Sequence, residues 1–156
     1  MQCMDNKTSK LTLYLDLCVY NRPFDYQGQE RIALETGAFI YILERIEKGF
    51  YNLVISEALT YENAKNPDED RKDRIFSYFG LAEEIIKMDN SDIKRAKVLK
   101  DLGFTDIDAL HIALAEKGNI NYFVTCDDGI LRLYTKNKNT IKVDIISVIE
   151  LVNKEK

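Results

Sequence analysis

Residues 11–16 of this 156-residue chain read LTLYLD. The first five of them form a short apolar run of β-favouring side chains, which is typical of a strand that is buried on both faces. Such strands occur in parallel sheets that helices cover on both sides. The run ends at Asp16, and we expect loop structure to begin there, with Asn21, Arg22 and Pro23 in the loop.

Helix and strand patterns alternate along the rest of the chain. We expect strands at residues 53–55, 122–125 and 143–146, and helices at about 29–48, 57–65, 68–79, 90–102, 107–117, after Asp128 and after Ser147. Residues 82–88 fit either a helix or a short strand, and we favour an edge strand at 85–88. N-terminal helix caps are expected at Ser56, at Asn90 or Ser91, and at Ser147. Glycines that end helices at their C-termini are expected at Gly49, Gly103 and Gly118. The alternation predicts an α/β fold with a mainly parallel central sheet and helices on both faces.

The composition indicates one compact domain inside the cell. We expect a single domain at residues 11–153 after an N-terminal tail at 1–10. The apolar runs are far shorter than the ~20 residues of a membrane-spanning helix, so we expect no membrane partner. Cys3, Cys18 and Cys126 match no zinc or disulfide spacing, and we recognise no signal peptide, which favours the cytoplasm. A net charge of −4 argues against a large basic surface for nucleic acid.

Acidic side chains follow several of the expected strands. Asp16 ends the first strand, and Asp127 comes just after the strand that ends at Thr125. Glu57 and Glu62 lie on the helix that follows the second strand. In open parallel sheets, ligand sites lie outside the carboxyl ends of the strands. We therefore expect these carboxylates at one edge of the sheet.

Asp108 is unusual because it opens a helix whose next turns, residues 109–115, are largely apolar. Removing an ionised carboxylate from water costs several kcal/mol, so such a group needs a cation or hydrogen-bond donors. A helix N-terminus contributes only about 0.3–1 kcal/mol. A shared Mg²⁺ or Mn²⁺ would stabilise a cluster of acids more strongly, and it would activate water for attack on a phosphodiester.

The order and spacing of four motifs resemble those of one known family. The motifs are LYLD at residues 13–16 with NRPF at 21–24, Ser56 followed by Glu62, DALHIA at 108–113, and VTCD at 124–127. Over nearly the whole chain the sequence resembles the PIN-domain ribonucleases, which include the VapC-type toxins of bacterial toxin–antitoxin pairs. The resemblance implies a three-layer α/β/α sandwich that cleaves single-stranded RNA with Mg²⁺ or Mn²⁺.

The resemblance also assigns roles to individual residues and partners. It implies that Asp16, Glu62, Asp108 and Asp127 are the catalytic acids, and that the three aspartates bind the metal. Glu62 is preferred to Glu57 because the family's glutamate commonly lies about two helical turns past the strand; Glu57 remains the alternative. An antitoxin protein and a homodimer are the partners that the resemblance implies.

Five further residues near these motifs are secondary candidates. Asp106 is expected to be a helix cap and Asp128 a solvated neighbour, although either could hold an outer-sphere water. His111 lies one turn after the third acid, where we favour a packed role over one that orients a ligand. Asn21 and Arg22 lie in the expected loop, where the arginine could contact a phosphate.

Three other functions compete with this interpretation. A phosphoacceptor signalling domain would place adjacent acids after an early strand and a lysine after the last one, but Asp127 and Asp128 come late and no lysine follows residues 143–146. A phosphatase of the Asp-x-Asp type is disfavoured by Cys18, which also departs from the hydroxyl or amide residue usual in the family. A catalytically silent PIN-like binding module would have to keep like charges together without a cation, at a high electrostatic cost.

Overall fold

The computed structural model describes residues 10–155, and its centre is one all-parallel sheet. Within this range the sheet has five strands in the order β3-β2-β1-β4-β5. The strands are β1 (Leu11–Leu15), β2 (Tyr51–Ser56), β3 (Glu84–Ile86), β4 (Tyr122–Thr125) and β5 (Asp144–Ser147). The register pairs Leu13 with Leu53 on one side of β1 and with Tyr122 on the other. The predicted parallel sheet is therefore confirmed, with the LTLYL strand at its centre.

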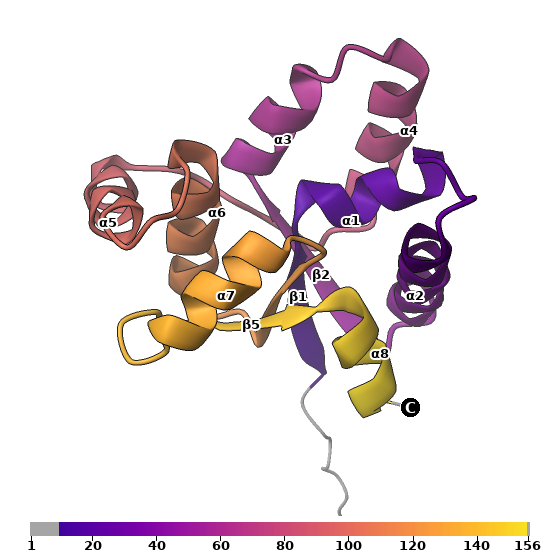
Figure 1. Cartoon of the computed structure of the whole chain (residues 1–156). Helices are drawn as coiled ribbons and strands as arrows, with labels where there is room; N and C mark the ends of the chain where they lie inside the picture. The colour runs from indigo at the N-terminus through magenta and orange to yellow at the C-terminus, as the bar shows by residue number, and fades with distance from the viewer. Residues whose placement is uncertain (1–9, 156) are drawn as a thin grey trace, which may run out of the picture.

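Helices cover both faces of this sheet (Figure 1). They are α1 (Leu17–Asn21), α2 (Glu30–Glu47), α3 (Glu57–Ala64), α4 (Glu69–Phe79), α5 (Asn90–Lys100), α6 (Asp106–Lys117), α7 (Asp128–Lys136) and α8 (Val148–Glu155), with a 3₁₀ turn at Arg22–Phe24. Figure 1 shows α2 and α8 on one side of the sheet, α5, α6 and α7 on the other, and α3 and α4 beyond the carboxyl end of β1. Within residues 10–155, none of these helices combines the length and apolar character needed to cross a bilayer.

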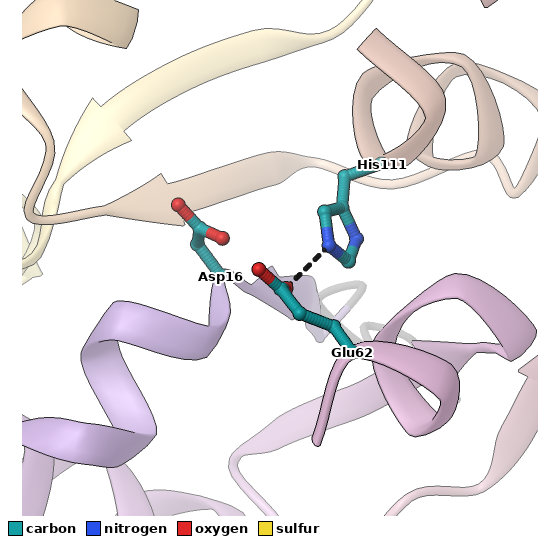
Figure 2. A group of neighbouring side chains, drawn as sticks. All are labelled: Asp16, Glu62 and His111. Atoms are coloured by element: carbon teal, nitrogen blue, oxygen red, sulfur yellow. Dashed lines mark hydrogen bonds and ion pairs between the residues drawn. The ribbon is translucent and has the colours of Figure 1, made fainter. Parts of the chain in front are cut away.

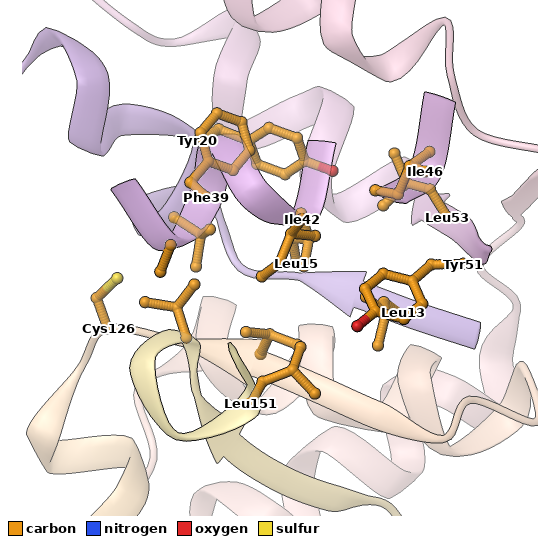
Figure 3. Close-up of a cluster of buried hydrophobic side chains, with 14 of the residues drawn as sticks. Leu13, Leu15, Tyr20, Phe39, Ile42, Ile46, Tyr51, Leu53, Cys126 and Leu151 are labelled. Carbon is orange, nitrogen blue, oxygen red and sulfur yellow. The ribbon is translucent and has the colours of Figure 1, made fainter. Parts of the chain in front are cut away.

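Alternation along the central strand divides the interior into two cores. Leu13 and Leu15 point to one face, where they pack with Phe39 of α2 and Leu151 of α8 (Figure 3). Tyr14 points to the opposite face and packs with residues of α5, α6 and α7. Successive side chains of a strand point to opposite faces, so a strand with large apolar side chains on both faces joins two apolar layers. This arrangement is the predicted three-layer α/β/α sandwich.

The prediction of a loop directly after Asp16 is wrong, because helix α1 begins there. Asp16 is its N-cap and accepts a hydrogen bond from the backbone N–H of Leu17 at 2.9 Å. Val19 and Tyr20 of this short helix are completely buried. Five residues form no stable helix alone, so burial against the sheet decides the conformation.

Three local boundaries also differ from the prediction. Asp89, and neither Asn90 nor Ser91, caps α5, in a reciprocal capping box with Asp92. Thr105 caps α6, so the predicted capping role of Asp106 is wrong. The edge strand begins at Glu84, one residue before the expected start, and ends at Ile86. The predicted caps at Ser56 and Ser147 are confirmed by hydrogen bonds to backbone amides three residues ahead.

Candidate metal centre

The candidate site lies where the strand order reverses. From β1 the chain continues to β2 and β3 on one side, whereas β4 and β5 occupy the other side. The crevice between β1 and β4 is therefore the topological switch point at which open α/β sheets bind ligands. Asp16 is fixed in this crevice, because its backbone N–H donates to Val124 O at 2.8 Å.

The Asp16 carboxylate is buried and held in one orientation. Thr125 Oγ1 donates to its Oδ2 at 2.8 Å, and the backbone N–H of Leu17 donates to its Oδ1. The Cys18 thiol lies 3.4 Å from Oδ2, so this departure from the family pattern leaves a weak donor in place. Burial raises the pKa of Asp16, and the nearby His111 lowers it in part. The ionised form is thus costly unless a positive charge compensates it.

Thr125 links two of the predicted acids through one hydroxyl. Its Oγ1 donates to Asp16 and accepts the backbone N–H of Asp127 at 3.0 Å. We did not single out this threonine in the sequence. The usable signal is its position two residues before Asp127, but its contact with Asp16 depends on β1 pairing with β4, 109 residues apart in sequence.

Glu62 and His111 join Asp16 in one compact group. One ligand atom from each of these three residues lies within 4.8 Å of the others. Figure 2 shows Glu62 from α3 and His111 from α6 side by side, with Asp16 facing them from the end of β1. His111 Nε2 lies 2.8 Å from Glu62 Oε1, and the ring is completely buried.

A buried hydrogen-bonded chain holds His111 in place. The Tyr14 hydroxyl lies 2.5 Å from Ser56 Oγ and 2.6 Å from His111 Nδ1. The Glu62 carboxylate can only accept, so His111 donates to it from Nε2. In the neutral ring Nδ1 is then an acceptor for the Tyr14 hydroxyl proton, and the Tyr14 oxygen accepts the proton of Ser56, whose Oγ also accepts the amide N–H of Leu59. The chain selects one histidine tautomer, so this residue is both packed and able to orient Glu62.

Asp108 lies in the first turn of α6 and senses the same charges. Burial raises its pKa to about 6, and the charge of Asp16 adds to the shift, with a smaller contribution from Asp127. His111 and the Thr105 hydroxyl act in the opposite direction. Asp108 therefore lies within electrostatic range of Asp16 and Asp127.

Asp127 is the N-cap of α7. Its Oδ1 accepts the backbone N–H of Gly129 at 2.7 Å and that of Ile130 at 3.2 Å. Neither Asp127 nor Asp108 belongs to the compact group formed by the described residues. Their role as metal ligands stays a prediction.

The remaining acidic candidates have other partners. Glu57 Oε1 accepts the backbone N–H of Met88 at 2.7 Å, whereas Glu62 belongs to the compact group. This geometry favours Glu62 over Glu57 as the second acid. Asp106 is 82% exposed at its side chain and pairs with Lys100 at 2.8 Å, which leaves it on the surface.

The other two charged candidates, Arg22 and Asp128, form ion pairs with neighbouring side chains. Arg22 pairs with Asp25 at 2.8 Å and with Glu35 at 2.7 Å, so its charge is already compensated within the fold. Asp128 is 57% exposed at its side chain, as expected of a solvated residue, and it accepts two hydrogen bonds of 2.8 Å from Arg31. These arginines are therefore paired with acids other than Asp16, Glu62, Asp108 and Asp127.

The residues present fit a hard divalent cation. Among residues 10–155, no lysine or arginine forms an ion pair with Asp16, Glu62, Asp108 or Asp127. Two of these carboxyls have raised pKa values because of burial. Carboxylate oxygens are the donors that Mg²⁺ and Mn²⁺ prefer, and a divalent ion supplies the positive charge that the cluster lacks.

Comparison with solved structures identifies the architecture. One similar chain belongs to the crystal structure of VapBC2 from Rickettsia felis bound to a DNA fragment from their promoter, with a TM-score of 0.54, 16% identity, and coverage of 88% of this chain and 98% of that chain. Another belongs to FitAcB from Neisseria gonorrhoeae, with a TM-score of 0.56, 16% identity, and coverage of 87% and 97%. The fold is PIN-like. No protein-family model matches the sequence, and no curated protein matches it. The PIN-like fold places the switch-point crevice, and therefore the acids, at the carboxyl edge of the sheet.

Proposed function

We propose that this protein is an endoribonuclease that uses Mg²⁺ or Mn²⁺ to hydrolyse phosphodiester bonds of single-stranded RNA. The observation that carries the proposal is the convergence of Asp16 and Glu62 with His111 within 4.8 Å, at the switch point and without a lysine or arginine partner among the described residues. A divalent ion bound there lowers the pKa of a water molecule and neutralises charge that develops on the phosphate.

The side chains of the site have separate tasks in this proposal. Asp16, Asp108 and Asp127 would hold the metal, and the Thr125 hydroxyl would fix the first of these relative to the last through its bonds to the Asp16 carboxylate and the Asp127 backbone N–H. Glu62 Oε1 is occupied by His111 Nε2, which leaves Oε2 to accept a proton from the attacking water. No nucleophilic side chain is needed, because water is the nucleophile.

In the cell, we assign this protein the role of the toxin in a toxin–antitoxin pair, acting as a cytoplasmic homodimer that an antitoxin protein inhibits. Support comes from the motif resemblance to VapC-type toxins and from the fold likeness to chains of VapBC2 and FitAcB. Expression of the wild type should arrest growth, and expression of Asp16→Asn should not. Co-expression with the product of an adjacent small gene should restore growth.

The activity is tested with purified protein and a fluorescent single-stranded RNA in Mg²⁺ or Mn²⁺. The wild type should cleave, EDTA should stop cleavage, and Asp16→Asn should fall to the EDTA background. Asp144→Asn is the matched control, because Asp144 is an exposed residue at the start of β5, away from the carboxyl ends of the strands. Equal activity of the wild type and Asp16→Asn at high purity would overturn the proposal, and an inactive wild type would favour the silent binding module.

A further inference from the structure

A second concave site lies directly beside the acids. It is a groove of about 320 Å³, with walls from α3, from α6 and from the segment after β3. Its lining is mostly apolar and consists of Glu57, Ala58, Tyr61, Met88, Ile107 and Leu110. The volume lies at the lower end of the range for small-molecule sites, which suits a group the size of one nucleotide.

The groove adjoins the acidic group because the same two helices form both. Ala58 lines the groove and stands one helical turn before Glu62, on the same side of α3. Ile107 has the same relation to His111 on α6. Glu62 and His111 are joined by the 2.8 Å contact between Oε1 and Nε2. The side of α3 and the side of α6 that line the groove therefore also lead to the acidic group.

The groove presents an aromatic ring to solvent, and a lysine outside the groove lining lies against that ring. Tyr61 is 58% exposed, although it is a large side chain beside an apolar floor. Lys65 Nζ lies 4.3 Å from the centre of its ring. An aromatic face stacks on any nucleobase, and an adjacent ammonium attracts the phosphate of the same strand. This charge matters because the neighbouring centre is acidic and would repel an RNA backbone without a cation.

One polar group in the groove can distinguish between bases. Glu57 Oε1 accepts the backbone N–H of Met88, which fixes the carboxylate in the wall. Its second oxygen, Oε2, can accept from an exocyclic amino group, as acidic side chains do with base edges. Adenine, cytosine and guanine carry such a group, and uracil does not.

We propose that this groove binds the nucleobase next to the scissile phosphate, with the base stacked on Tyr61 and its amino group bonded to Glu57. The inference rests on the proposed ribonuclease function and names a base-recognition site for the same reaction. A second copy of this chain is the other occupant that an apolar groove of this kind could take, and the experiment separates the two.

The test measures RNA affinity without cleavage. Labelled oligoadenylate in EDTA is titrated with the wild type, Tyr61→Ala and Tyr61→Phe, and binding is followed by fluorescence anisotropy. Tyr61→Ala should weaken binding by about 5- to 100-fold, and Tyr61→Phe should retain it, because a stacked ring contributes that much per base. Phe76→Ala is the matched control, since Phe76 is an aromatic residue of α4 that is 65% exposed and lies outside the groove; its affinity should not change.

Base preference and association state supply independent readouts. Glu57→Gln should reduce the preference for oligoadenylate over oligouridylate by about 5- to 10-fold. Unchanged RNA affinity in Tyr61→Ala, while the wild type cleaves RNA with Mg²⁺, would overturn the groove assignment and leave the proposed function intact. Conversion of a dimer to a monomer by Tyr61→Ala, with RNA affinity unchanged, would show that a second copy covers the groove. A wild type that binds RNA but never cleaves it would overturn the proposed function alone.

Discussion

Replacing Tyr14 with phenylalanine tests the buried hydrogen-bonded chain beneath the acids. Tyr14 is completely buried, and its hydroxyl lies 2.5 Å from Ser56 Oγ and 2.6 Å from His111 Nδ1. The substitution removes both contacts but keeps the ring, which stacks on Phe123. Packing is therefore preserved, and the measured effect reports on the hydroxyl.

The loss of stability in Tyr14→Phe depends on which of the two partners of the hydroxyl is left without a hydrogen bond. Ser56 Oγ keeps the amide N–H of Leu59 at 3.2 Å, whereas His111 Nδ1 becomes a buried acceptor without a donor. An orphaned buried acceptor costs about 1–3 kcal/mol, and a lost hydrogen bond about 1 kcal/mol. We expect the free energy of unfolding to fall by about 2–4 kcal/mol, or the Tm by roughly 4–16 °C. His111 also loses one of the two hydrogen bonds that fix the orientation of its ring, so kcat should fall more than KM rises.

Tyr20 provides a matched control within the same protein. It is also completely buried, but its hydroxyl has no hydrogen-bond partner among residues 10–155. Tyr20→Phe removes an unsatisfied polar atom and should be neutral or stabilising in urea unfolding. Equal losses of stability in Tyr14→Phe and Tyr20→Phe would refute the hydrogen-bonded chain.

Three further predictions concern the acids and one helix. Thr125→Val removes the hydroxyl that joins Asp16 to the last acid, so RNA cleavage in Mg²⁺ should fall by about 10- to 100-fold, with the circular dichroism unchanged. Burial raises the pKa of Asp108 to about 6, so the folded protein holds its proton more tightly than the unfolded chain between about pH 4 and pH 6. In EDTA, wild-type stability should therefore decrease as the pH rises through this window, whereas Asp108→Asn should lack this component; identical pH profiles in urea would contradict the raised pKa. Gly37 lies within α2, and a Cβ there meets nothing within 4 Å, so Gly37→Ala should raise the free energy of unfolding by about 0.5–1 kcal/mol; a loss would show that a contact needs the glycine.

Local patterns predicted most of the elements because each pattern has a local cause. The LTLYL run carries Leu13 and Leu15 on one face and Tyr14 on the other, and the strand it predicted joins the two cores. Helix α2 was predicted from its apolar spacing, and it ends before Gly49, whose φ of 83° suits a residue without Cβ. Helix α1 was missed because its stability comes from burial of Val19 and Tyr20, which no local pattern reveals.

Two acids of the candidate site, Asp16 and Glu62, were predicted from the sequence, but the side chains that hydrogen-bond to the site were not. Asp16 and Glu62 were found from strand ends and motif resemblance, and the fold brings them together. The hydroxyl of Thr125 and the buried chain through Tyr14 were not found, because each depends on contacts across many residues. Tyr14 and His111, for example, are 97 residues apart in sequence.

The sequence by itself therefore determined most of the element types, the parallel sheet and the presence of acids after its strands, since period and propensity act over a few residues. Only the tertiary structure decided the strand order, with β1 between β2 and β4. That order places the Thr125 hydroxyl on Asp16 and lets α3 and α6 bring Glu62 to His111. The physical reason is that strand pairing and helix packing minimise exposed apolar surface over the whole chain, and this global condition is not contained in any short stretch of it.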